Sequence, residues 1–117
     1  MDTVLVENNK NTHLTDRLYF IRDLILNSVN REIIQKVYLF GSYAYGEPDE
    51  ESDFDLCVII NDNNDKMKIY MDISLNLINH HILNFDLLVY RNEVFIKAIQ
   101  KDGIENLIYN KGKILYA

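Results

Sequence analysis

Three aspartates and a Gly-Ser pair are the residues of this chain whose types and spacing could do chemistry. Gly41 and Ser42 follow an apolar segment. Ten residues later, Asp53 and Asp55 stand at the start of a second apolar segment, and Asp86 lies within a third. Glycine lets a backbone approach a phosphate closely, the first N–H groups of a helix attract anions, and paired carboxylates bind Mg²⁺. The pattern therefore indicates a site for a metal-bound nucleoside triphosphate and favours nucleotidyl transfer.

We expect the three carboxylates to form one site. Asp53 and Asp55 are two residues apart on a strand, so their side chains share a face and repel each other unless a cation or a proton intervenes. Asp86 stands in an apolar run, where a charge without a partner is costly, and a neighbouring third strand would bring it to the pair. In such a site two Mg²⁺ ions would activate an attacking hydroxyl and steady the triphosphate, and Asp86 would accept the hydroxyl proton.

Each part of the pattern also has an ordinary structural interpretation. The Gly41-Ser42 pair could be a simple turn from strand to helix. Asp53 and Asp55 could be a solvated strand start, and Asp86 an edge-strand residue that faces water. Order along the chain disfavours some rivals: in haloacid-dehalogenase-type phosphatases and many glycosyltransferases the strand precedes the Asp-x-Asp pair, whereas here it follows. The chain also has no Gly-x-x-x-x-Gly-Lys-Ser/Thr loop, which excludes a P-loop ATPase.

Other side chains are weaker candidates. His80 and His81 could bind a metal, but adjacent side chains point apart, which favours a surface or packing role. Tyr43 and Tyr45 could stack on a base or belong to the core. Arg91 could reach a phosphate or a partner, or simply end a strand in solvent.

Hydrophobic spacing predicts the elements that must position these residues. Apolar residues at helical spacing predict a helix, and short apolar runs bounded by turn residues predict buried strands. The helix at 65–79 has Met67, Met71, Leu75 and Ile78 on one face. The expected elements are helices at 14–30, 42–45 and 65–79, a helix from an Asn92 cap to Gly103, strands at 34–40, 53–60 and 83–90, and a short edge strand or docked tail at 113–116. We expect an α/β fold with a small mixed β-sheet flanked by helices.

Length and composition narrow the class of protein. The chain of 117 residues predicts a single domain, 1–117, in which residues 1–11 are polar and loosely ordered. A net charge of −6 disfavours direct nucleic-acid binding and favours a basic protein partner. The single cysteine, Cys57, excludes an internal disulfide and is expected in the core. No stretch approaches the ~20 apolar residues of a membrane span, and no signal peptide is apparent, so we expect a cytoplasmic location.

Gly41-Ser42, Asp53-x-Asp55 and the later Asp86 together resemble the DNA polymerase β-like nucleotidyltransferase superfamily. The resemblance covers about residues 33–90, and the short chain looks most like the minimal nucleotidyltransferase (MNT) group. This resemblance implies a polymerase β-like core in which Gly41 and Ser42 hold the triphosphate of ATP. It also implies that Asp53, Asp55 and Asp86 bind Mg²⁺.

The same resemblance implies a function. Members of this group are antitoxins paired with HEPN-domain toxins, and the implied reaction transfers AMP from ATP to a tyrosine of the HEPN ribonuclease, silencing it. The chain has no room for an acceptor-binding domain, so the acceptor is expected to dock from outside. Two alternatives remain: a non-catalytic antitoxin that neutralises by binding, and a small-molecule nucleotidyltransferase with a separate acceptor-binding subunit.

Overall fold

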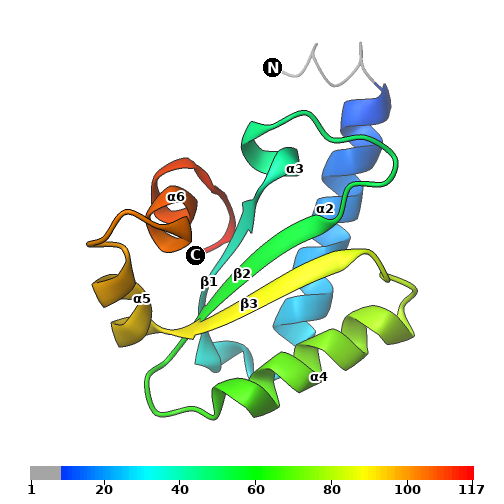
Figure 1. Ribbon diagram of the computed structural model, residues 1–117. Coiled ribbons are helices and arrows are strands. Elements are labelled where there is room, and N and C mark those ends of the chain that lie inside the picture. The colour runs from blue at the N-terminus through cyan, green and yellow to red at the C-terminus, as the bar shows by residue number, and fades with distance from the viewer. Residues whose placement is uncertain (1–8) are drawn as a thin grey trace.

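A four-stranded sheet with helices on both faces forms the protein (Figure 1). The computed structural model describes the backbone of residues 9–117 and the side chains from residue 13 on. The elements are α2 (Asn9–Ser28), η1 (Arg31–Ile33), β1 (Ile34–Phe40), α3 (Ser42–Tyr45), β2 (Phe54–Ile60), α4 (Lys66–Asn79), β3 (Phe85–Arg91), α5 (Asn92–Ala98), α6 (Ile104–Lys111) and β4 (Lys113–Tyr116). No helix in this part of the chain is long and apolar enough to cross a membrane.

The strand order is β3-β2-β1-β4, and β3 and β4 are the edges. β1 runs antiparallel to β2 and β4, whereas β2 and β3 are parallel, which confirms the predicted mixed sheet. The register pairs Phe40 with Asp55 and Asp55 with Asp86. The end of β1 and the starts of β2 and β3 therefore meet at one end of the sheet.

Two hydrophobic cores lie on opposite faces of the sheet. In the larger one, Ile21 of α2 and Ile73 of α4 pack against Leu56 of β2. In the smaller one, Phe95 of α5 and Ile108 of α6 pack against the other face, and these helices lie at the left of Figure 1. Because successive side chains of a strand alternate between faces, Asp55 projects from the face that α5 and α6 cover.

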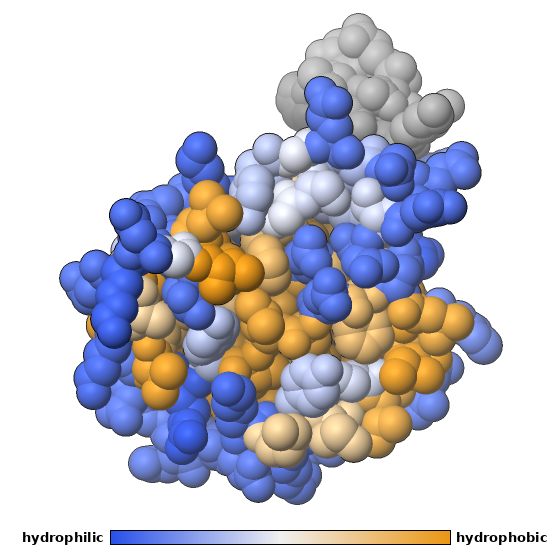
Figure 2. Space-filling model, in the orientation of Figure 1, coloured by the Kyte–Doolittle hydropathy of each residue, from blue (hydrophilic) through white to orange (hydrophobic). Residues whose placement is uncertain are grey.

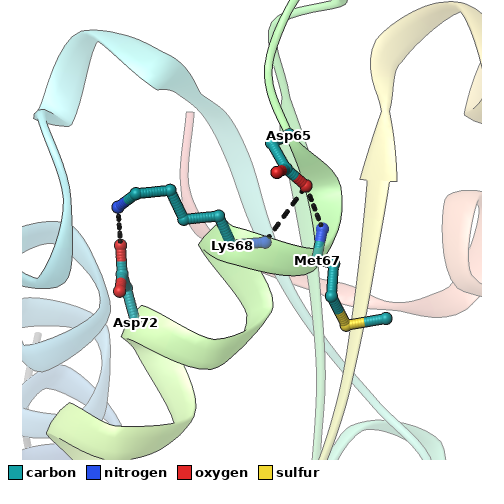
Figure 3. Close-up of polar contacts among 4 residues, drawn as sticks. All are labelled: Asp65, Met67, Lys68 and Asp72. Atoms are coloured by element: carbon teal, nitrogen blue, oxygen red, sulfur yellow. Dashed lines mark hydrogen bonds and ion pairs between the residues drawn. The ribbon is translucent and has the colours of Figure 1, made fainter.

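Helix α4 has well-defined caps at both ends. The Asp65 carboxylate accepts hydrogen bonds from the backbone N–H groups of Met67 at 3.1 Å and Lys68 at 3.2 Å (Figure 3). At the other end, the N–H of His81 donates to the carbonyl of Ile78, and the N–H of Ile82 to that of Leu77. These bonds form a Schellman motif, which places His81 at a φ of +64°.

The structure confirms the predicted strands to within two residues and corrects several helices. Helix α2 begins at Asn9 rather than 14 and ends at Ser28; the expected loose ordering of 1–11 lies, for residues 1–8, outside the described part of the chain. The helix predicted from Asn92 to Gly103 is present as α5 but ends at Ala98, and α6, which follows Gly103, was not predicted. Gly103 precedes α6 instead of ending α5, and Arg91 rather than Asn92 is the cap residue of α5.

Two contacts hold helix α6 in place. Ile108 is fully buried and anchors α6 on the sheet. Asn106 donates a hydrogen bond from its side chain to the carbonyl of Ile99 at 2.8 Å, which satisfies a backbone acceptor at the end of α5. The terminal segment 113–116 is an edge strand beside β1, one of the two alternatives left open by the sequence.

One prediction about α4 was incomplete. Met67, Met71, Leu75 and Ile78 do lie on the helix as expected, but their side chains are exposed. The residues that α4 buries against the sheet and α2 are Ile69, Ile73 and Leu77.

Candidate active site

Gly41 makes the turn at the end of β1 and has a backbone conformation that other residues rarely adopt. Its φ is +72° and its ψ is −151°, and its carbonyl accepts hydrogen bonds from the N–H groups of Ala44 and Tyr45, both at 3.0 Å. A Cβ at this position would lie 2.8 Å from Cγ of Asp55. Glycine is therefore favoured by the positive φ, and a Cβ would also force the Asp55 carboxyl to move from its present position.

Ser42 opens the four-residue helix α3 directly after this turn and is half-buried. Its carbonyl accepts a hydrogen bond from the N–H of Gly46 at 3.1 Å, which closes the short helix. The helix packs on β1 and β2, so Ser42 lies at the same end of the sheet as Asp55. Gly41 and Ser42 therefore lie beside the carboxylates with which the sequence pattern grouped them.

Asp55 and Asp86 are brought together by the parallel pairing of β2 and β3. Burial raises the pKa of the Asp55 carboxyl, and repulsion from Asp86, a hydrogen bond shared with Asp86 and the charge of Asp53 raise it further. Two acidic side chains in contact are destabilising unless a proton or a cation lies between them. The predicted meeting of the second and third strands is thus observed at these two residues.

Asp86 differs from the prediction in its burial. It was expected to be a costly buried charge, but β3 is an edge strand and the Asp86 side chain is exposed. Water can therefore solvate this carboxylate on one side while Asp55 lies on the other. An exposed carboxylate at the edge is accessible to a group that approaches from outside the protein.

Asp53 lies immediately before β2, is exposed, and has the smallest of the effects on the pKa of Asp55. Within residues 9–117, no three His, Cys, Asp or Glu side chains are grouped closely enough to hold a metal ion. The donor set nevertheless fits Mg²⁺ in its chemistry, because Mg²⁺ is usually bound by one or two carboxylates and completes its shell with water and substrate phosphates. A cation at Asp55 and Asp86 would also offset their repulsion.

A pocket of about 410 Å³ opens beside this carboxylate pair. Its walls are mainly apolar and aromatic, and Asp55 and Asp86 are its acidic lining residues. It is lined by Phe40, Asp55, Tyr70, Phe85, Asp86, Leu87, Leu88 and Ile104. Tyr70 and Ile104 were not predicted as site residues, since only the tertiary arrangement brings α4 and α6 to this end of β3.

The weaker candidates take structural roles in the described part of the chain. Tyr43 stacks on Phe54 with ring centroids 4.6 Å apart, so it packs on the core, whereas Tyr45 is exposed. His80 and His81 end α4, and Nδ1 of His80 lies 2.8 Å from the carbonyl oxygen of Asn76. Arg91 is exposed at the end of β3.

Cys57 is fully buried, as predicted, and is not suited to act as a nucleophile. Burial, followed by the charge of Glu105, raises the pKa of its thiol to about 12. Because the thiolate is the reactive form, this cysteine is inert at neutral pH.

Comparison with known proteins places this arrangement in a family. The family model described as "Polymerase beta, Nucleotidyltransferase" matches residues 23–116. A Methanocaldococcus jannaschii protein named as a protein adenylyltransferase is 32% identical over 91 residues, covering 78% of this chain and 87% of the relative.

Solved structures share the fold. A toxin–antitoxin crystal structure with AMP-PNP has a TM-score of 0.59 at 22% identity, covering 86% of this chain and 73% of the other. A tri-AMPylated Shewanella oneidensis HEPN toxin in complex with an MNT antitoxin matches with a TM-score of 0.52 at 22% identity, over 86% and 69% of the two chains. The family match spans the whole sheet and every residue of the candidate site. This chain therefore belongs to the polymerase beta nucleotidyltransferase family.

Proposed function

We propose that this chain is an antitoxin that transfers AMP from ATP to a tyrosine hydroxyl of a HEPN-domain ribonuclease toxin and thereby silences it. The observation that carries the proposal is the contact between Asp55 and Asp86 beside the Gly41 turn. It is supported by the relative named as a protein adenylyltransferase and by the fold shared with an MNT antitoxin bound to an AMPylated toxin.

In this proposal the residues divide into a nucleotide side and an acceptor side. Gly41 and Ser42 hold the triphosphate, because the turn at Gly41 leaves backbone close to Asp55 and starts α3 there. Asp55 and Asp86 would hold Mg²⁺, and Asp53 would join them only on metal binding, since the three side chains are not grouped as a metal site in the described residues. A bound ion would supply charge that stabilises the phosphates in the transition state.

Asp86 is assigned the acceptor side because it is exposed at the sheet edge. There it accepts the proton of the incoming tyrosine hydroxyl. The hydroxyl oxygen forms a bond to the α-phosphorus of ATP while the bond to pyrophosphate breaks, so that AMP is transferred and pyrophosphate leaves.

The same proposal names the partner. A net charge of −6 suits a basic, RNA-cutting protein and disfavours direct binding of nucleic acid to this chain. The pair would form a hetero-oligomer in the cytoplasm, where ATP and Mg²⁺ are available. The acceptor comes from outside, since the described elements form one sheet with its covering helices.

Intact-mass spectrometry tests the proposal. The chain is incubated with ATP, Mg²⁺ and the protein encoded by the neighbouring gene, in parallel with the Asp53→Ala/Asp55→Ala variant. A matched control, Glu47→Ala/Glu50→Ala, removes two exposed acidic side chains from the loop that precedes Asp53. We expect the mass of one or more AMP groups on the partner with the wild-type chain and the control, and none with the aspartate variant.

Other outcomes decide between the alternatives. An unmodified partner that is nevertheless inhibited in a stable complex would contradict AMP transfer and favour neutralisation by binding. AMP on a small molecule, with none on the partner, would favour a small-molecule nucleotidyltransferase.

A further inference from the structure

A second pocket continues from the candidate active site along the free edge of β3. It has a volume of about 260 Å³ and lies between the first turns of α4 and the edge strand. It shares Tyr70, Leu87 and Leu88 with the pocket that contains Asp55 and Asp86. We call this second pocket the edge groove; it is lined by Lys66, Met67, Tyr70, Leu87, Leu88, Val89 and Tyr90.

Strand β3 lines the edge groove with residues that also pack in the two cores, but Met67 on the opposite wall packs in neither. Met67 is 64% exposed, although α4 already buries Ile69, Ile73 and Leu77 in the core. The Met67 side chain points to the side of β3, away from the Lys68–Asp72 ion pair (Figure 3). In Figure 2 apolar surface covers much of the face formed by β3 and α4. Exposed apolar surface of this kind marks interaction sites.

The β3 edge adds a second recognition element. In the described sheet β3 pairs only with β2, so the N–H and C=O groups of its outer edge have no partner strand. An extended peptide can add to such an edge, with backbone hydrogen bonds that give affinity and side-chain pockets that give specificity. The edge groove supplies one such pocket directly beside the free edge.

We propose that the edge groove docks an extended, apolar segment of the acceptor protein, which adds as a strand to β3 and brings its hydroxyl to Asp86. This inference rests on the proposed AMP transfer. The acceptor is the occupant because the groove adjoins the pocket of Asp55 and Asp86 and shares Tyr70, Leu87 and Leu88 with it, so a strand that continues along β3 from the groove leads to the carboxylates. A second copy of this chain in the same place would block the site it borders.

The positive charge of Lys66 indicates how far from the acceptor hydroxyl an acidic residue of the docked segment lies. Lys66 lies at the end remote from Asp86, with its Nζ 5.8 Å from the centre of the Tyr90 ring. From Asp86 to Tyr90 a strand spans four residues, or about 13 Å. The docked segment therefore carries an acidic residue about four positions from the acceptor hydroxyl, with apolar side chains between them.

A matched pair of variants tests the groove. Met67→Glu places a charge in it, whereas Met71→Glu places the same charge one turn away, at a position that is also exposed but does not line the groove. Steady-state AMP transfer to the HEPN-domain protein is measured with thermal unfolding as a check on folding. We expect the KM for the acceptor to rise at least tenfold for Met67→Glu with little change in kcat, and to stay within twofold for Met71→Glu.

Site-specific cross-linking provides an independent readout. Cys57 is the chain's only cysteine and is fully buried, so Met67→Cys and Met71→Cys each create a single accessible thiol for a benzophenone maleimide. We expect the probe at position 67, and not at 71, to capture the acceptor peptide that includes the AMP-modified residue.

The outcomes separate the two proposals. If the wild-type chain transfers AMP but the variants at 67 and 71 behave alike in both assays, the docking site is wrong and the proposed function stands. If the wild-type chain transfers no AMP to the HEPN-domain protein, both are overturned.

Discussion

Gly41→Ala is expected to destabilise the fold by about 2–6 kcal/mol, and most of the effect beyond backbone strain should depend on Asp55. The strain of a non-glycine residue at a φ of +72° and a ψ of −151° costs about 1–3 kcal/mol. The new Cβ would also lie 2.8 Å from Cγ of Asp55, and overpacking of this kind costs about 1–3 kcal/mol. The two contributions can be separated because only the second requires the Asp55 carboxyl.

A double-mutant cycle distinguishes the cost of backbone strain at position 41 from the cost of the contact with the Asp55 carboxyl. Urea denaturation gives the free energy of unfolding for the wild-type chain, Gly41→Ala, Asp55→Ala and the double variant. In the Asp55→Ala background the carboxyl is gone and the Asp55 Cβ remains 3.2 Å from the new methyl group. We expect Gly41→Ala to cost only about 1–3 kcal/mol there, so that the coupling energy is at least ~1 kcal/mol.

Gly103→Ala is the control for the general effect of adding a methyl group at a glycine. Its φ of −170° is ordinary extended backbone, and the nearest atom to a new Cβ is a carboxylate oxygen of Glu105 at 3.4 Å. Because Gly103 is also the N-cap residue of α6, its effect should stay within about 1 kcal/mol, the usual cost of alanine at an N-cap. If the effects of Gly41→Ala and Asp55→Ala were additive to within ~0.5 kcal/mol, the glycine would not be required by the carboxyl, and our account of the site would be refuted.

Three further changes probe stability around the site. His81→Gly should raise the free energy of unfolding by about 0.5–1 kcal/mol, because glycine adopts a φ of +64° without strain; urea denaturation measures this. Tyr90→Phe should lower it by about 1–2 kcal/mol by removing the 2.6 Å hydrogen bond that the phenol donates to Glu105. Burial and that bond raise the pKa of Tyr90, so this contribution is present at neutral pH and is lost as the pH rises through the folded-state pKa. Asp55→Asn should abolish AMP transfer yet stabilise the fold at pH 7 by less than about 1 kcal/mol after solvent screening, in unfolding measured without Mg²⁺.

The pH dependence of Asp55→Asn follows from the direction of the pKa shift. The folded state raises the pKa of Asp55, so the wild-type chain loses stability as the pH rises through that folded-state pKa. The advantage of the asparagine variant should therefore be present at neutral pH and vanish below the unfolded-state pKa of about 4. An advantage that persisted at pH 3 would show that the gain does not come from ionisation of Asp55.

The strands and the Gly41 turn were predictable because their signals are local. Each of β1, β2 and β3 contains an apolar run of at least four residues bounded by polar or glycine residues, which is sufficient to place the strands to within two residues. The contact of Asp55 with Asp86 was only a hypothesis from sequence, because it needs β2 and β3 to be parallel neighbours in register. Strand order depends on tertiary packing, which no local pattern specifies.

Helix α4 shows where periodicity fails. Both of its faces are apolar, one with Ile69, Ile73 and Leu77 and the other with the residues at positions 67, 71, 75 and 78. Spacing predicts the helix correctly for either face but does not tell which one is buried. Helix α6 was missed for a different reason: it buries little apart from Ile108, and the preceding Gly103 looks like the end of a helix instead of the start of one.

Two features of this domain lower the stability of the isolated folded chain, and they are adjacent in the structure. The acidic pair of Asp55 and Asp86 opposes folding when both are ionised, and the exposed Met67 face of α4 leaves apolar surface in water. Natural sequences depart from the rules of stability mainly at functional sites. If the acidic pair and the exposed apolar surface had unrelated causes, there would be no reason for their pockets to share Tyr70, Leu87 and Leu88. Delivery of an acceptor hydroxyl along β3 explains both, because the carboxylates need a bound cation and nucleotide, and the groove needs a docked segment.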